Sequence, residues 1–174
     1  MNKYLLLILT ALTFSFVSCD DYEPGATATE ALAGDWYVTY SVKVGNEWQE
    51  LVGPVLLTTY NTAANVSTEM FVDDHGSFWE FKGKVKANPS GRSFGSDNEV
   101  DNYYYDSKFK VKDGLVLPKQ AHSPSNVVTD SIVFYVSFND DGYENDNGEM
   151  VLTPYETTYR VSGFRRTGFL EDEF

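Results

Sequence analysis

A run of strictly alternating side chains from Trp36 to Val44 constrains the fold of this chain more than any other stretch. Its apolar residues fall on every second position, with polar or tyrosine side chains between them. Successive side chains of a β-strand point to opposite faces, so the run predicts a strand with one apolar face. The inward face would carry Trp36, Val38, Tyr40, Val42 and Val44.

The same two-residue period returns along the chain, interrupted by short turn-forming segments. We expect further strands at 47–52, 55–60, 66–72, 77–87, 103–112, 115–117, 127–138 and 155–164. Gly45-Asn46 and Asp113-Gly114 are dipeptides that favour two-residue hairpins. One helical turn is expected from Ala28 to Ala33, because Thr27 and Glu30 fit a capping box. About eight short antiparallel strands with almost no helix predict an all-β domain, an up-and-down barrel or a sandwich.

The first 18 residues predict an export signal. Lys3 precedes an apolar run of 14 residues, which is shorter than the roughly 18 to 20 that span a bilayer. Phe16-Val17-Ser18-Cys19 resembles the lipobox of bacterial lipoproteins, which implies cleavage before Cys19 and lipidation of its thiol. The alternative is an ordinary secretory signal beside an unrelated cysteine. Cys19 is the only cysteine, so no intrachain disulfide can form.

Residues 19–27 are acidic and rich in turn formers, which predicts a tether ahead of a single barrel domain at 28–174. An acidic stretch directly after the cysteine resembles the surface-export signal of Bacteroides-type lipoproteins, which implies the outer face of the outer membrane. The formal net charge of −13 disfavours nucleic acid as a partner. It also disfavours anionic lipid headgroups, so we expect membrane attachment through the N-terminal acyl anchor only.

Gly34-Asp35-Trp36 at the start of the first strand resembles the Gly-x-Trp signature of the lipocalin/calycin superfamily. In that superfamily an arginine at the end of the last strand stacks on the tryptophan through a cation–π contact. The resemblance implies this role for Arg165, with Arg166 as its competitor. The whole chain resembles the Bacteroides lipoprotein family called lipid-binding putative hydrolase. That resemblance implies a calycin-like, up-and-down barrel of about eight strands.

Gly91-Arg92-Ser93-Phe94-Gly95 matches the Gly-x-Ser-x-Gly pattern of serine hydrolases, and Asp106 and His122 follow in the order of α/β-hydrolases. In those enzymes the serine sits on a turn between a strand and a helix. Here the pattern falls in a predicted loop between two strands. We therefore expect no catalytic residue, and keep a lipid or ester hydrolase using Ser93 as an alternative function.

Metal ligation has weak support. His75 and His122 both lie in predicted turns without a second histidine or a cysteine nearby. The segment from Asp140 to Glu149 supplies oxygen ligands, but its glycines do not fit the register of an EF-hand loop. We expect a solvated acidic turn there, with no metal and no cofactor.

Alternating lysines lie on the outward side of two predicted strands, at Lys82, Lys84, Lys86, Lys108, Lys110 and Lys112. They could form one basic face for phosphate or sulfate groups. That possibility gives a second alternative, a non-enzymatic glycan- or surface-associated module. They could equally serve solubility and protect strand edges against aggregation, which is the favoured interpretation.

Large aromatic side chains dominate the predicted inward face. The candidates for contact with a ligand are Trp36, Tyr40, Trp79, Phe81, Tyr103, Tyr105, Phe109, Phe134 and Tyr159. They could fill the barrel, or they could line a pocket in which tyrosine hydroxyls orient an apolar ligand. The alternation does not separate these two arrangements. We expect a surface lipoprotein that binds a hydrophobic or amphipathic, lipid-like small molecule in a β-barrel.

Overall fold

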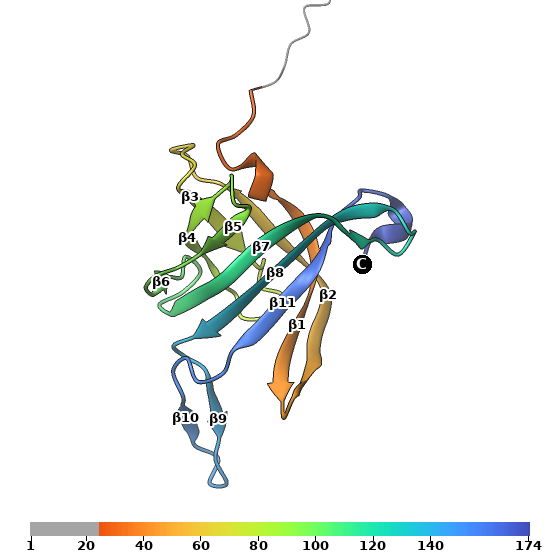
Figure 1. Ribbon diagram of the computed structural model, residues 1–174. Coiled ribbons are helices and arrows are strands. Elements are labelled where there is room, and N and C mark those ends of the chain that lie inside the picture. Colours follow the sequence, from red (N-terminus) through yellow and green to blue (C-terminus); the bar gives the residue numbers. More distant parts are fainter. Residues whose placement is uncertain (1–24) are drawn as a thin grey trace, which may run out of the picture.

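The computed structural model describes residues 25–174, and β-strands dominate this part of the chain (Figure 1). Nine strands form one antiparallel sheet in the order β5-β4-β3-β2-β1-β11-β8-β7-β6. A pairing between β5 and β7 closes eight of them into a ring. The predicted all-β, barrel-like architecture is therefore confirmed. In residues 25–174, no helix is long and apolar enough to cross a membrane.

The strands of the sheet are β1 (Gly34–Val44), β2 (Glu47–Asn61), β3 (Glu69–Asp73), β4 (Lys82–Asn88), β5 (Ser93–Gly95), β6 (Val100–Asp101), β7 (Lys108–His122), β8 (Val128–Phe138) and β11 (Tyr159–Arg165). A separate hairpin is made by β9 (Gly142–Glu144) and β10 (Met150–Leu152). Two 3₁₀-helices, η2 (Glu30–Leu32) and η3 (Leu170–Asp172), precede and follow the strands.

The first and last long strands of the chain, β1 and β11, are neighbours in the ring. β1 pairs with β11 in a continuous register that runs from Trp36 opposite Arg165 to Val42 opposite Tyr159. On its other side β1 pairs with β2 through the Gly45-Asn46 turn. The inward residues of β8 are the fully or almost fully buried Ile132, Phe134, Val136 and Phe138, as their alternation predicts.

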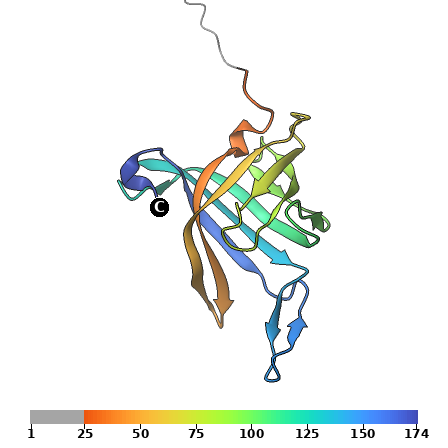
Figure 2. The ribbon, with the colours of Figure 1, turned by 180° about the vertical axis from the view of Figure 1, so that it is seen from behind.

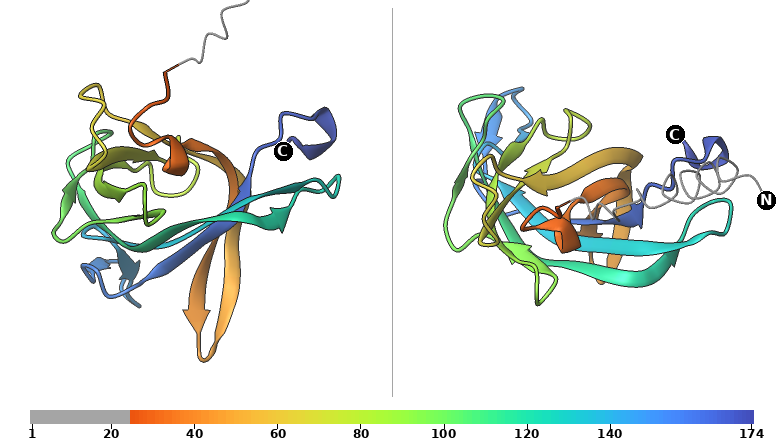
Figure 3. Two further views of the ribbon diagram at one scale, coloured as in Figure 1. Left: turned by 45° about the horizontal axis from the view of Figure 1, so that its top comes forward. Right: turned by 90° about the horizontal axis from the view of Figure 1, so that it is seen from above.

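The two ends of the ring differ. At one end η2 lies over the opening (Figure 3), and Leu32, the last residue of η2, is completely buried. At the other end the loop of residues 74–81, between β3 and β4, crosses the opening. The β1–β2 and β9–β10 hairpins project beyond the ring on this second side (Figures 1 and 2). We call this second side the aromatic end, because Phe78 and Trp79 of the loop pack there against the core.

Three predicted local structures were wrong. Asp113-Gly114 is not a hairpin turn but the extra length of a bulge within β7, where the register against β8 shifts between Lys112 and Leu115. Asp113 takes a left-handed φ of 53°, and a Cβ on Gly114 would lie 2.6 Å from the Phe94 ring. The predicted capping box also fails, because the cap of η2 is Thr29 and its side chain makes no capping hydrogen bond.

The third correction concerns strand starts. The strands expected from 77 and 103 begin only at Lys82 and Lys108. Residues 77–81 and 102–107 instead form loops at the aromatic end. The two strands expected at 47–52 and 55–60 are one continuous strand, β2. Its register against β1 shifts at Gly53-Pro54.

Candidate functional site

One carboxylate organises the loop that closes the aromatic end. Asp74 is completely buried, and its oxygens accept backbone N–H bonds from Gly76 at 2.9 Å, Trp79 at 3.0 Å and Phe81 at 2.8 Å. A fourth, longer N–H bond comes from Phe78. Burial raises the pKa of Asp74, and the N–H donors oppose that rise. The loop is therefore built around this side chain.

The loop presents two aromatic rings to the barrel. The Phe78 ring stacks on Tyr40 with centroids 4.3 Å apart, and the Trp79 ring stacks on Phe138 at 4.7 Å, tilted by only 8°. Tyr159 packs edge-on against Phe78 at 5.1 Å. These five rings join the loop to the interior in one continuous aromatic cluster.

A groove open to solvent adjoins this cluster. Its volume is about 410 Å³, and it is lined by Phe78, Trp79, Glu80 and Tyr105. Phe78 and Trp79 are half-buried, so part of each ring faces the core and part lines the groove. The groove thus connects solvent to the aromatic interior.

Acidic residues surround the groove. Asp140 accepts hydrogen bonds from the Trp79 indole N–H at 3.1 Å and from the Tyr105 hydroxyl at 2.6 Å. Asp141 accepts one from the Tyr159 hydroxyl at 3.0 Å. Burial and the adjacent Asp141 carboxylate both raise the pKa of Tyr159. The Tyr159 hydroxyl therefore remains protonated and serves as a donor.

A second acidic contact lies behind the loop. Asp73 accepts hydrogen bonds from the Tyr104 hydroxyl at 2.6 Å and contacts the Lys82 ammonium at 3.1 Å. Burial acts to raise the pKa of Asp73, but these donors and the His75 N–H outweigh it, so the net pKa is lowered. The bond to Asp73 raises the pKa of Tyr104 to about 12.

The barrel interior is filled by side chains. Trp36, Tyr40, Phe81, Phe109 and Phe134 are completely buried, and their rings lie among Val, Leu, Ile and Met residues. Open grooves are instead bordered by residues of the loops and the barrel wall. The aromatic side chains could either fill the barrel or line a pocket. They fill the interior, and a groove open to solvent lies at the aromatic end.

The inward orientation expected of two tyrosines was wrong. Tyr103 is 60% exposed and Tyr105 is 39% exposed. Both belong to the loop of residues 102–107, where Asn102 bonds to Glu80 and Ser107 and ends the two-residue alternation. Tyr105 still lines the groove, whereas Tyr103 packs outside the barrel, edge-on to Phe71.

Several residues of the aromatic end were not among the expected site residues: Asp74, Phe78, Glu80, Phe138, Asp140 and Asp141. An aspartate two residues before a glycine, as in Asp74-His75-Gly76, is typical of a side chain that bonds to its own turn. That signal was available in the sequence for Asp74. The contacts of Asp140 span 61 and 35 residues of chain, so no local pattern indicates them.

The opposite end of the barrel carries the Trp36 contact. The Arg165 guanidinium carbon lies 4.7 Å from the Trp36 ring centroid, as the Gly-x-Trp resemblance implies. A Cβ on Gly34 would lie 3.0 Å from Arg165 Nη1, so glycine leaves room for this stack. The competitor Arg166 instead forms a two-pronged contact with Glu173. The Trp36 indole N–H donates to Thr59 Oγ1 at 2.9 Å.

The serine of the Gly-x-Ser-x-Gly pattern lies apart from its expected partners. Ser93 borders an open groove of about 590 Å³ over β4, β5 and β7. It pairs with Leu115, and His122 lies seven residues farther along β7, which is roughly 20 Å away. Asp106 precedes the opposite end of β7. The three residues are therefore not assembled into a triad.

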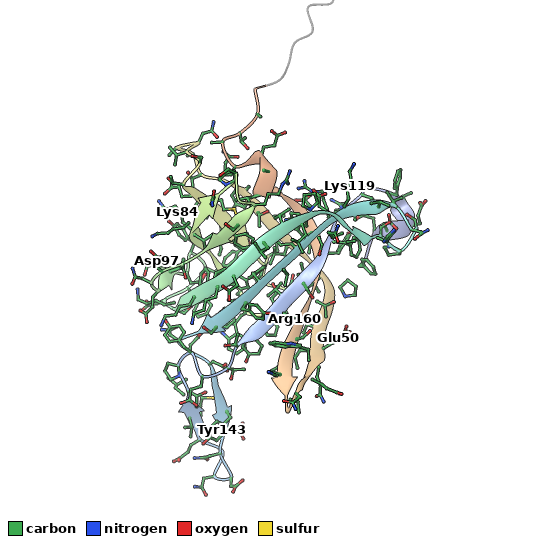
Figure 4. All side chains as sticks on the ribbon, viewed as in Figure 1. Glu50, Lys84, Asp97, Lys119, Tyr143 and Arg160 are labelled. Carbon is green, nitrogen blue, oxygen red and sulfur yellow. The ribbon has the colours of Figure 1, made fainter. Side chains whose placement is uncertain are left out.

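The outward lysines do not form one free basic face. Lys82 pairs with Asp73 and Lys84 with Glu69 at 3.0 Å. Lys86 pairs with Asp97, and Lys108 pairs with Asp101. Figure 4 places Lys84 and Asp97 on the outside of the barrel near β4. The two strands that carry these lysines, β4 and β7, are not paired with each other, because β5 lies between them.

The acidic stretch after β8 forms the β9–β10 hairpin. Asn145 closes its tip by accepting N–H bonds from Asn147 and Glu149. Tyr143 lies on this hairpin, beyond the ring, and its side chain is exposed (Figure 4). In residues 25–174, no three His, Cys, Asp or Glu side chains converge as a metal site would require.

Comparison with known proteins supplies the family. A search of curated proteins gives no match. A family model described as lipid-binding putative hydrolase matches residues 21–170, which include every strand of the barrel and the whole aromatic end. The match covers far more than half of the chain. The chain belongs to the lipid-binding putative hydrolase family.

Proposed function

We propose that the protein binds a hydrophobic or amphipathic, lipid-like molecule at the aromatic end of the barrel. The observation that carries the proposal is the open groove whose Phe78 and Trp79 walls continue into the buried aromatic cluster. The description of the family supports a lipid as the ligand. Because the interior is packed, an alkyl chain lies along the groove and reaches deeper only where Phe78 moves off Tyr40.

The groove is shallow and open, so useful affinity requires the ligand to bury further apolar surface where Phe78 moves off Tyr40. Burying roughly 400 Å² of apolar ligand and protein surface at about 25 cal/mol per Å² contributes about 10 kcal/mol. Association costs at least about 4 kcal/mol of lost translational and rotational freedom. The remainder corresponds to dissociation constants around 10⁻⁵ to 10⁻⁴ M.

Calorimetric titration tests this function. Secreted Cys19→Ala protein, which has no thiol to acylate, is titrated with monoacylglycerols of increasing chain length below their micelle concentrations. Affinity is expected to rise with chain length, and Trp79→Ala is expected to lower it at least tenfold. Trp48→Ala is the matched control, because Trp48 packs against Tyr135 and Arg160, away from the groove residues. Binding that ignores Trp79 but depends on another surface would contradict the proposed site.

We also propose that the protein is a lipoprotein of the outer membrane, anchored through Cys19 and exposed at the cell surface. The signal-like residues 1–18, the lipobox resemblance and the acidic residues after Cys19 support this location. Cys19 lies outside the described residues, so the support comes from sequence. Cys19→Ala should move the protein from the membrane to the soluble fraction. A mature protein without the mass of acyl chains would contradict the proposal.

A further inference from the structure

We propose that the aromatic end selects amphiphiles whose head group is positively charged, an amine or a quaternary ammonium. The inference rests on the proposed function, since it assigns the chemistry of the head group to the same groove. The argument follows from the carboxylates, the aromatic faces and one unpartnered hydroxyl at this end.

The groove carries negative charge without a cation of its own. Glu80 is the single charged residue among the four that line it, and Asp140 holds two of the other three through their polar atoms. In the described part of the chain, no lysine or arginine lies within 4.0 Å of either carboxylate. Lys82 directly follows the loop, at the start of β4, and its partner is Asp73.

The partners of these carboxylates are neutral donors. Asp140 receives an indole N–H and a phenol O–H, Asp141 a phenol O–H and its neighbouring amide, and Asp74 four amides. Neutral donors satisfy the hydrogen-bonding capacity of the carboxylate oxygens, but they do not neutralise the negative charge of the carboxylates. Several carboxylates of one sign around a cleft raise the local concentration of a cation and repel an anion.

The aromatic surface complements a cation as well. Quaternary and primary ammonium groups bind over tryptophan and tyrosine faces, and the contact strengthens where water is excluded. One face of the Trp79 indole is covered by Phe138, and Trp79 and Tyr105 both line the groove. Asp140 bonds to both rings and so holds them in place before a ligand arrives.

An independent observation lies beneath Phe78. The Tyr40 hydroxyl is completely buried and has no hydrogen-bond partner within residues 25–174. Buried hydroxyl groups normally find a partner, because an unmet one costs free energy. The Tyr40 ring touches Phe78 and lies in the field of Asp73 and Asp74. A primary ammonium head group at the inner end of the groove would supply the N–H donor that this oxygen lacks wherever Phe78 moves off the Tyr40 ring, with its alkyl chain lying outward along the groove.

Three amphiphiles of one chain length separate charge from apolar binding: dodecylamine, monolauroylglycerol and dodecanoate. Each is titrated into Cys19→Ala protein at pH 7 below its micelle concentration. Dodecylamine is expected to bind at least tenfold more tightly than dodecanoate, with monolauroylglycerol between them. Raising the salt from 50 to 500 mM is expected to shrink the difference, since screening weakens charge contacts.

Two variants locate the effect. Glu80→Gln keeps the shape of the side chain and removes its charge, so it is expected to weaken dodecylamine binding three- to tenfold and monolauroylglycerol binding by a smaller factor. Asp97→Asn removes one charge beside Lys86, away from the groove, and controls for the overall negative charge of the protein. An equal loss in both variants would overturn the proposal in favour of non-specific attraction.

The outcomes distinguish the two levels of inference. Equal affinity for all three amphiphiles, or a preference for dodecanoate, overturns the head-group proposal and leaves lipid binding intact. Failure of all three to bind overturns the proposed function itself. Loss of the dodecylamine preference in Glu80→Gln, with Asp97→Asn unchanged, supports the proposal.

Discussion

At the scale of single residues, the two arginine–tryptophan contacts of the barrel differ in burial. Arg165 stacks at 4.7 Å on Trp36, which is completely buried. Arg160 lies 5.4 Å from Trp48 on the outer face of the sheet. Cation–π contacts are worth about 0.5–1 kcal/mol where exposed and about 2 where desolvated. The Trp36 contact is therefore the one that stabilises the closed ring.

Removing this guanidinium should destabilise the barrel. Arg165→Met is expected to lower the free energy of unfolding by about 2 kcal/mol, because the cation–π contact and the ion pair to Asp130 are both lost. Arg160→Met, the matched control, should cost about 0.5 kcal/mol. Urea unfolding followed by circular dichroism measures both. Equal losses of unfolding free energy in the two variants would show that the Arg165–Trp36 contact stabilises the barrel no more than the exposed Arg160–Trp48 contact.

Ser93 gives a second residue-scale prediction. A serine hydroxyl is a weak nucleophile unless a base takes its proton, and the expected base His122 lies far along β7. Purified protein is therefore expected to show no covalent labelling by a fluorophosphonate probe. Stoichiometric labelling that disappears in Ser93→Ala would revive the hydrolase alternative.

At the scale of elements, the loop of residues 74–81 depends on one side chain. Asp74→Ala leaves four backbone N–H groups without their acceptor. Unfolding free energy is expected to fall by roughly 2 to 4 kcal/mol, since each unmet buried donor is costly. Limited proteolysis should cut the variant within the loop. Asp97→Ala, which removes an exposed carboxylate, should remain resistant.

The C-terminal segment gives a prediction about pH. Asp172 binds the Ser125 amide at 2.7 Å and the Thr167 hydroxyl at 2.6 Å. Burial acts to raise the pKa of Asp172, but these donors prevail and lower it to about 2. A carboxylate whose folded pKa lies below its unfolded value stabilises the protein above pH about 4, and this contribution is lost toward pH 2.

Hydrogen exchange at the Ser125 amide checks this linkage. Its protection is expected to fall between pH about 4 and about 2, after correction for the intrinsic rate. Asp172→Asn should show weak protection that no longer changes over that interval. Unchanged protection of the wild type down to pH 2 would mean that Asp172 does not hold the segment.

The alternation of apolar and polar residues correctly predicted strands that are paired on both sides. It failed where side-chain hydrogen bonds fold the chain into a loop. Phe134 and Phe138 are buried as their spacing requires, because β8 is paired on both sides. Tyr105 is not inward as expected, because residues 102–107 form a loop held by Asn102 and regular alternation starts only with β7. The groove itself depends on Asp140 bonding to Trp79 across 61 residues, which a local pattern does not contain. Fold class was therefore predictable, and the site was predictable only in its aromatic composition.

At the scale of the whole molecule, the two ends of the barrel are closed in different ways. η2, Trp36 and Arg165 close the first with a buried stack. The second is closed by a loop whose rings are shared between the core and a groove. A barrel filled along its length has space for a ligand only where a side chain can be displaced. Phe78 is the side chain in that position, because it covers Tyr40 and also lines the groove.

Truncation of Phe78 should create space that an alkyl chain refills. Phe78→Ala is expected to lose about 3 kcal/mol of stability, the usual cost of removing a packed phenyl ring. Adding monolauroylglycerol at 100 times its dissociation constant for the variant should return about 2.7 kcal/mol, and at that same lipid concentration the rise in melting temperature should exceed that of the wild type, which is expected to bind more weakly.

The matched control for this rescue is Phe94→Ala. Phe94 packs on Phe134 inside the barrel and is not among the residues that line the Phe78 groove. Its truncation should cost a similar amount of stability, with no greater ligand-induced rise in melting temperature than in the wild type. Scanning calorimetry with and without lipid measures all three proteins. Equal rescue of the two variants would mean that lipid fills any vacancy in the core, and the aromatic end would lose its claim to be the binding site.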